Sequence, residues 1–160
     1  MPKGDFIRKM ALHRWKLNFF MLQQLPMGFL AGLRILNLDV KHAQVRIPFK
    51  YVNKNPFRSM YFASQSMAAE LSTGIMAMAA VRDTGFSISM LVLEMKSSFL
   101  KKATTPIIFS CHQGQEIAAT IQKAIDTNEG QIITVKSIGQ NTQNEIVSEF
   151  EFTWTFKLKT

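Results

Sequence analysis

Residues 55–81 read NPFRSMYFASQSMAAELSTGIMAMAAV, and they form the most informative stretch of the chain. Between Ser59 and Val81 the only charged residue is Glu70. Ala, Ser, Met and Gly dominate the stretch, which is typical of a helix buried on most of its sides. An ionised carboxylate inside such a helix is costly unless it is paired, hydrogen-bonded or protonated. We therefore expect a central helix over residues 59–83 and a specific reason for Glu70.

Alternating apolar residues flank this helix on both sides. Leu33–Phe49 predicts a β-hairpin in which Ala43, Val45 and Ile47 share one face. After Gly85 the pattern predicts strands over 86–100, 106–112, 131–139 and 145–159, and a helix over 114–130. The last strand places five large apolar side chains on one face: Phe150, Phe152, Trp154, Phe156 and Leu158. The sequence thus predicts one α+β domain over 1–160, with a curved antiparallel sheet wrapped around a long central helix.

An N-terminal helical segment, residues 1–31, precedes the sheet and central helix of residues 32–160. Phe6–Leu22 mixes large apolar residues with basic ones, and Pro26 with Gly28 predicts a break followed by a short helix. One interpretation is a helix packed on the flank of the domain, and the other is a helix lying on a membrane surface. We favour packing, because basic amphipathic helices are common on ordinary domains, and we do not expect membrane association.

Charge and composition restrict the partners. The chain of 160 residues carries a net charge of +8. Residues 1–52 hold nine Lys and Arg against two Asp, a net of +7. This excess favours anionic partners, but no basic run or nucleic-acid motif is present, so we expect no nucleic acid. A single cysteine, Cys111, indicates a reducing, cytoplasmic location, and the scattered His13, His42 and His112 predict no metal site.

The order of elements and the spacing Asn55…Glu70…Gly74 resemble the hotdog-fold thioesterases of the phenylacetate-pathway type. In that family a loop Asn precedes a His-Gly-Gly turn, and an acidic residue and a Gly follow within the same helix. The resemblance covers roughly residues 30–159 without a gap in the motif. It implies a hotdog fold, with thioester hydrolysis as the expected activity and coenzyme A present only as part of the substrate.

Two departures from the family pattern leave a second function open. Tyr61-Phe62-Ala63 replaces His-Gly-Gly, and Val92 lies where the family has a Ser or Thr on the following strand. Glycine lets a substrate approach the backbone closely, which larger side chains oppose. These losses favour a protein that binds a fatty-acyl chain or acyl-CoA without cleaving it. The retained Asn, Glu and Gly favour the hydrolase.

The resemblance also implies roles for individual residues. The backbone N–H groups of Phe62 and Ala63 would polarise the thioester carbonyl at the helix N-terminus. Glu70 would act as base or nucleophile, with a pKa raised by burial, and Asn55 would help to position the water or the partner of Glu70. Such sites form between two protomers, so a homodimer is implied, and tetramers are common in the family. The alternative is that Glu70 merely hydrogen-bonds Ser66, Thr73 or Asn55.

Residues around the helix start, along the helix and at a strand end are expected to contact the substrate. They are Phe57, Arg58, Tyr61, Ser66, Met67, Thr73, Gly74, Lys101 and Lys102. The three cations would meet the phosphates of coenzyme A, or else are ordinary solvated charges. The aromatic residues and Met67 would line an acyl pocket, or else belong to the core.

Overall fold

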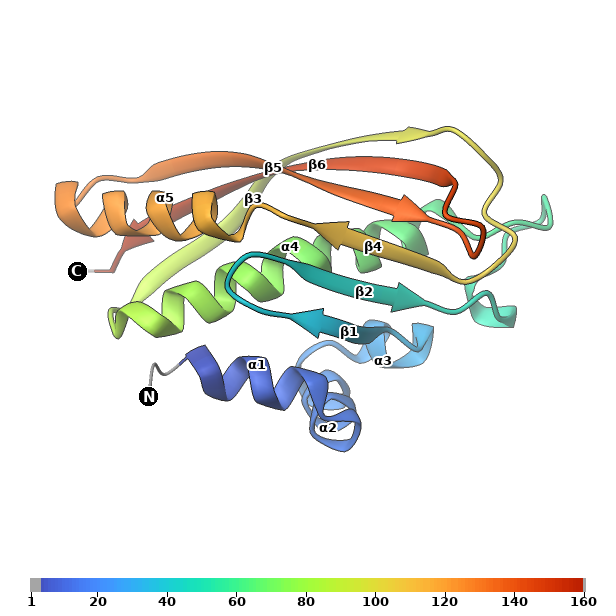
Figure 1. Cartoon of the computed structure of the whole chain (residues 1–160), viewed down its shortest axis with the longest axis horizontal. Helices are drawn as coiled ribbons and strands as arrows, with labels where there is room; N and C mark the ends of the chain where they lie inside the picture. The colour runs from blue at the N-terminus through green and yellow to red at the C-terminus, as the bar shows by residue number, and fades with distance from the viewer. Residues whose placement is uncertain (1–3, 160) are drawn as a thin grey trace.

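A six-stranded antiparallel sheet wraps around one long helix, α4 (Phe62–Thr84), in the computed structural model, which describes residues 4–159 (Figure 1). The strand order is β1-β2-β4-β5-β6-β3. The strands are β1 (Arg34–Leu38), β2 (Ala43–Ile47), β3 (Ile88–Phe99), β4 (Ile107–Cys111), β5 (Gln131–Gln140) and β6 (Ile146–Leu158). The predicted fold class is confirmed. Residues 1–3 and 160, the ends of the predicted domain, lie outside the described residues.

The helix is buried because its side chains are small where the sheet approaches. Its fully buried residues include Ala68, Ala69, Ser72, Ala77 and Ala79. Against them lies the predicted aromatic face of β6, with Phe150, Phe152, Trp154 and Phe156 all buried. Between α4 and the neighbouring strand β5, the buried hydroxyls of Ser72 and Ser137 share a hydrogen bond of 2.7 Å, so neither is left unsatisfied.

The predicted start of the central helix at residue 59 was wrong by three residues. Backbone partners outside the helix hold the preceding loop: Met60 N–H donates to the carbonyl of Ala103, and Tyr61 N–H donates to that of Asn53, each at 2.7 Å. These bonds fix an extended chain, and the helix begins only at Phe62. Its end follows the prediction, since Gly85 adopts the left-handed conformation (φ 74°) that stops a helix.

The N-terminal segment forms three helices, α1 (Gly4–Leu12), α2 (Arg14–Gln24) and α3 (Pro26–Ala31). Phe6–Leu22, expected to have helical character, is helical except at His13, where the chain is extended. Ala11 and Leu17 are both buried, yet six residues of one straight helix would turn them about 120° apart. The break at His13 lets both face the domain.

The remaining elements complete the two sides of the sheet. A short 3₁₀ turn, η1 (Tyr51–Asn53), leads towards α4, and α5 (Gly114–Thr127) packs against α4, β5 and β6 as predicted for 114–130.

Strand β3 is an edge strand that pairs only with β6 among the described residues. Its register shifts between Val92 and Glu94, and from Leu93 onwards its residues are exposed.

Candidate functional site

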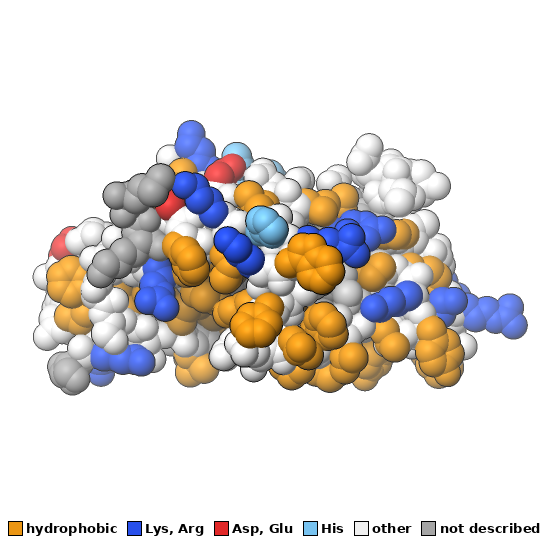
Figure 2. Space-filling view, turned by 90° about the horizontal axis from the view of Figure 1, so that it is seen from below, with side chains coloured by type: hydrophobic (Ala, Val, Ile, Leu, Met, Phe, Trp, Pro, Cys, Tyr) orange, Lys and Arg blue, Asp and Glu red, His pale blue; other side chains and the backbone are white. Residues whose placement is uncertain are grey.

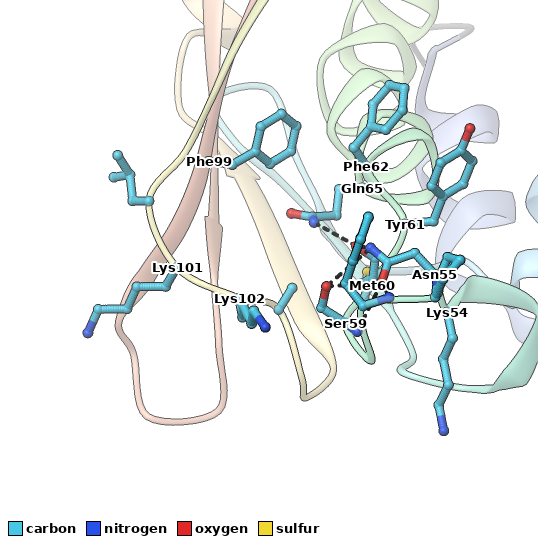
Figure 3. A pocket seen from close by; sticks show the side chains of 14 residues that line it. Lys54, Asn55, Ser59, Met60, Tyr61, Phe62, Gln65, Phe99, Lys101 and Lys102 are labelled. Atoms are coloured by element: carbon cyan, nitrogen blue, oxygen red, sulfur yellow. Dashed lines mark hydrogen bonds between the residues drawn. The ribbon is translucent and has the colours of Figure 1, made fainter.

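A cleft of about 770 Å³ opens between the loop before α4, the start of α4 and the end of β3 (Figure 3). Its volume falls within the range of small-molecule sites. The lining residues are Lys54, Asn55, Pro56, Phe57, Ser59, Met60, Tyr61, Phe62, Gln65, Phe99, Leu100, Lys101, Lys102 and Ala103. Segments far apart in the sequence thus bring most of the predicted loop and rim residues to one place.

Asn55 builds one wall of the cleft. Its side-chain oxygen accepts hydrogen bonds from the backbone N–H groups of Phe57 (3.0 Å) and Ser59 (3.1 Å). Its amide nitrogen donates to Ser59 Oγ at 3.1 Å. These bonds fold the loop tightly, so that Arg58 takes a left-handed conformation with φ 59°. Both polar atoms of Asn55 therefore shape the loop, and neither bonds Glu70.

The N-terminus of α4 faces this cleft without a side-chain cap. Tyr61 occupies the capping position in an extended conformation, and its side chain bonds none of the helix N–H groups. Among residues 4–159, no hydrogen-bond acceptor meets the N–H of Phe62 or Ala63. The first N–H groups of a helix attract negative charge because the helix dipole adds to their own polarity. This helix start is therefore able to receive a carbonyl oxygen.

A chain of aromatic rings runs from the cleft into the core. The ring centroids of Tyr61 and Phe62 are 4.9 Å apart, and those of Phe62 and Phe99 are 6.4 Å apart, both in edge-to-face geometry. Phe99 in turn meets the fully buried Phe150 at 5.7 Å. Phe57, also in the lining, is 74% exposed. Such a surface suits an apolar ligand, since it loses water contact when the ligand binds.

Cations lie on the rim of the cleft. Lys101 and Lys102 line it as predicted, but Lys101 is paired with Glu145 at 2.5 Å. Arg58 is not part of the lining. Lys54 does line it and was missed by the sequence analysis, although its position next to Asn55 in the loop was a usable signal.

Gln65 is a second residue that the sequence analysis missed. It lies one turn into α4, is 4% exposed and lines the cleft. Its Oε1 accepts a hydrogen bond from Ser148 Oγ at 2.8 Å, and its Nε2 donates to the carbonyl of Met60 at 3.4 Å. Gln65 thus joins α4 to β6 and to the loop. A long polar side chain among small residues was the available signal.

Glu70 lies about two helical turns beyond Phe62 on α4, which places it about 12 Å along the helix from Phe62. It is not part of the cleft lining. Burial raises the pKa of its carboxyl group above the ordinary value. Its carboxylate has no hydrogen bond within residues 4–159. Thr73 Oγ1 donates instead to the backbone carbonyl of Glu70, and Ser66 Oγ donates to that of Phe62. None of the proposed alternative partners, Ser66, Thr73 and Asn55, therefore bonds the Glu70 carboxylate, which is free among the described residues.

The carboxylate of Glu70 is placed by its neighbours Gly74 and Trp154. A Cβ atom at position 74 would lie 2.9 Å from Glu70 Oε1 and 3.2 Å from the Trp154 ring. Only a residue without a side chain leaves this space free. The predicted residues therefore form two groups, one at the cleft and the other around Glu70 on α4. Ala63, Ser66 and Met67 lie between them, are half-buried and do not line the cleft.

The single cysteine of the chain lies outside the cleft lining. Cys111 is fully buried, and burial raises the pKa of its thiol to about 11, which keeps it protonated. Within residues 4–159, no three His, Cys, Asp or Glu residues are close enough to hold a metal ion. None of the helices in that range has the length and apolar character needed to cross a bilayer.

The curved sheet around a buried helix and the cleft at the helix start define a hotdog-fold protein. Residues 13–156 match the family described as a domain of unknown function, DUF4442, and the chain belongs to this family. No protein with a curated description matches it.

Solved structures with the same fold include several proteins with thioesterase descriptions. A Pseudomonas aeruginosa protein of unknown function, described as a probable thioesterase, has a TM-score of 0.74 and 19% identity over 91% of this chain and 96% of its own. The Haemophilus influenzae thioesterase HI1161 has a TM-score of 0.66 and 12% identity over 90% of each chain. The Escherichia coli PaaI protein of the phenylacetic acid degradation operon has a TM-score of 0.62 and 12% identity over 96% of each. At these identities the likeness shows the fold.

Proposed function

We propose that the chain is an acyl-CoA-type thioesterase. One observation carries the proposal: an aromatic cleft of about 770 Å³ opens onto the uncapped N-terminus of a buried helix that also holds an unpaired carboxylate. The acyl chain would lie along the rings of Tyr61, Phe62 and Phe99. The phosphates of coenzyme A would meet the cationic rim.

The reaction follows from these groups. The N–H groups of Phe62 and Ala63 hold the thioester oxygen and stabilise the negative charge that develops on it. Glu70 either takes a proton from water, whose oxygen attacks the carbonyl carbon, or attacks that carbon itself to form an anhydride that water then opens. In both routes the carbon–sulfur bond breaks, and the thiolate leaves and is protonated. A raised pKa makes the Glu70 carboxylate a stronger base near neutral pH.

We propose that two copies of the chain complete the site. Within one chain Glu70 lies about 12 Å from the helix start, so a second chain must bring its own Glu70 to the thioester. The edge strand β3 supports a dimer, because a long unpaired edge invites pairing with another strand. Its apolar residues Leu91, Leu93 and Met95 are 59%, 52% and 42% exposed. A homodimer would cover them.

A second candidate, an acyl-binding protein without hydrolysis, is favoured by two observations. Phe62 and Ala63 stand at the helix start where the resembled enzymes have glycines, and the ring of Phe62 packs against that of Tyr61. Val92, paired with Trp154 across β3 and β6, offers no hydroxyl there. The larger side chains restrict access to the N–H groups, and the missing hydroxyl removes a polar group that the resembled enzymes have.

Thiol release from short-, medium- and long-chain acyl-CoAs tests the proposal, with binding followed by calorimetry. We expect turnover of one chain class by the wild type, its loss in Glu70→Gln with binding retained, and full turnover in the exposed control Glu149→Gln. Turnover that is unchanged in Glu70→Gln would reject Glu70 as the catalytic group. Binding without turnover by the wild type would establish the acyl-binding alternative.

A further inference from the structure

The N-terminal helices present an apolar face that nothing in the described chain covers. The inward side of α2 is buried through Leu17 and Met21. On the outward side, Trp15 is 79%, Phe19 is 63% and Phe6 of α1 is 69% exposed. Further exposed residues of the same helices are Leu12, Leu22, Met27, Phe29 and Leu30. The helices therefore have two apolar sides, one packed against the domain and the other exposed.

A groove of about 410 Å³ between α1 and α2 forms part of this face. It is lined by Phe6, Met10, Trp15, Lys16, Phe19, Phe20 and Gln23. Figure 2 shows orange apolar side chains gathered beside blue Lys and Arg, with red acidic side chains only towards one end of the view. Contiguous apolar surfaces of this kind mark interaction sites.

The charge of this face has one sign. No Asp or Glu occurs between Asp5 and Asp39, and Asp5 is paired with Arg8. Lys9, Arg14 and Lys16 are exposed, and none of them forms an ion pair within residues 4–159. Two copies of the face brought together would oppose cation to cation, which disfavours a second chain as the occupant. An anionic partner is complementary to it.

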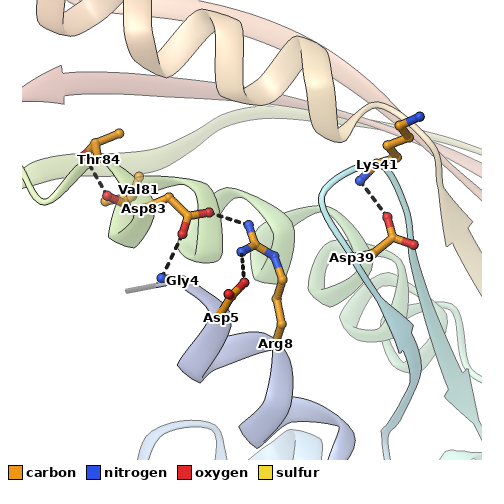
Figure 4. Close-up of polar contacts among 8 residues, drawn as sticks. All are labelled: Gly4, Asp5, Arg8, Asp39, Lys41, Val81, Asp83 and Thr84. Atoms are coloured by element: carbon orange, nitrogen blue, oxygen red, sulfur yellow. Dashed lines mark hydrogen bonds and ion pairs between the residues drawn. The ribbon is translucent and has the colours of Figure 1, made fainter. Parts of the chain in front are cut away.

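The face is held firmly on the domain. Arg8 of α1 bonds Asp83 near the end of α4 at 2.5 Å, and the backbone N–H of Gly4 donates to the same carboxylate at 2.9 Å (Figure 4). The aromatic side chains are thus presented on fixed helices, so binding does not require the segment to fold first.

We propose that the outward face of α1, α2 and α3 is a docking surface for an anionic phospholipid bilayer. Trp15 inserts at the level of the head groups, where its amphipathic ring is most stable, and the Phe side chains reach the acyl boundary. The cations meet lipid phosphates. The helices lie on the surface and do not cross it. This revises our expectation from the sequence, because packing on the flank and binding a membrane use opposite sides of the same helices.

Vesicle flotation tests the proposal, with phosphatidylcholine vesicles that contain or lack phosphatidylglycerol. Trp15 also serves as a fluorescent reporter, because the other tryptophan, Trp154, is 4% exposed. We expect binding and a blue shift of Trp15 emission only with the anionic vesicles. Replacing Lys9, Arg14 and Lys16 by Gln should weaken partitioning on the order of 100-fold. Phe19→Ser should weaken it while keeping the reporter.

Matched controls separate the face from general charge and stickiness. Ile132→Ser removes an apolar side chain that is 61% exposed on β5, and joint replacement of Lys123, Lys157 and Lys159 by Gln removes three cations elsewhere. Both should bind like the wild type. No binding to anionic vesicles, or equal loss in the controls, would overturn the proposal. So would a lipid-free oligomer, measured by light scattering, that dissociates in Phe19→Ser, because the occupant would then be a second copy. No substrate is used, so the outcome is independent of hydrolysis.

Discussion

Trp154 on β6 donates its indole N–H to Thr73 Oγ1 on α4 at 3.0 Å, inside the buried contact between sheet and helix. The same Thr73 hydroxyl donates to the carbonyl of Glu70 at 2.9 Å, and the Trp154 ring lies against Gly74. The sheet therefore fixes the turn of helix that carries the free carboxylate. A catalytic group needs such support to stay in a productive position.

Thr73→Val should destabilise the fold by about 1–3 kcal/mol, because the buried indole N–H of Trp154 loses its acceptor while the side-chain shape is kept. Urea unfolding measures the change. In the matched control Thr120→Val, on the exposed side of α5, a Thr hydroxyl that bonds only the carbonyl of Glu116 is removed. That change should stay within about 0.5 kcal/mol. Equal losses in the two variants would show that the indole bond adds nothing.

Gly74→Ala should reduce hydrolysis on the order of 10- to 100-fold with little effect on stability. The added methyl group would lie 2.9 Å from Glu70 Oε1 and displace the carboxylate. Higher helix propensity, worth about 1 kcal/mol, offsets the small movement required of the Trp154 ring. Gly130→Ala is the control, since no atom lies within 4 Å of a Cβ there. Steady-state kinetics and thermal unfolding of both variants measure these effects. A Gly74→Ala variant with wild-type activity would contradict the prediction.

Glu70 should cost the protein stability at neutral pH. Burial raises its pKa, so between the ordinary carboxyl value of about 4.3 and the raised value the folded state binds more protons than the unfolded state. Stability due to Glu70 is then lost as the pH rises through this window. Thermal unfolding should show that the stability of Glu70→Gln relative to the wild type increases as the pH rises over that range. Above it, the variant should remain the more stable of the two.

The rate of hydrolysis should rise with pH over the range in which the stability due to Glu70 is lost. Only the ionised Glu70 can act as base or nucleophile, so kcat/KM rises with pH through the raised pKa. A Glu70→Gln variant that is less stable than the wild type at neutral pH would contradict both expectations.

Phe62→Pro isolates the proposed N–H donor at the start of α4. Proline suits the first position of a helix, and Tyr61 before it is already extended (φ −61°, ψ 134°), as a residue before proline must be. The variant should therefore fold. It lacks both the ring and the N–H, whereas Phe62→Ala lacks the ring alone. We expect kcat to fall about 10²- to 10³-fold further in the proline variant, as for loss of one oxyanion donor. Similar kcat values in the two would exclude this N–H.

Strong periodic patterns made the architecture predictable. Few folds bury both the alternating apolar face from Phe150 to Leu158 and the Ala- and Ser-rich helix around Glu70. The break at His13 was not predictable, because it depends on the direction in which Leu17 must turn to meet the domain. The late start of α4 depends on bonds from Ala103 and Asn53, which local sequence does not reveal.

The candidate site was predictable only in its local part. Apart from Arg58, the predicted loop and rim residues line the cleft, because they are close in sequence to the helix start or to the end of the strand beside it. Gln65 was missed because its partner Ser148 is distant in the sequence. The separation of Glu70 from Phe62 follows from helix geometry. We propose that a second chain supplies Glu70 at the helix start, and the sequence pattern of one chain does not show how two chains pack.

Mixing two inactive variants tests most directly whether the helix start of one chain and Glu70 of another form one hydrolytic site. Phe62→Pro and Glu70→Gln chains are unfolded together, refolded at equal amounts and assayed for thiol release from acyl-CoA. In a two-fold symmetric dimer, random mixing leaves roughly a quarter of the sites with both groups intact. We expect recovery of roughly that fraction of wild-type activity. Activity that stays at the level of the separate variants, although mixed dimers have formed, would contradict it.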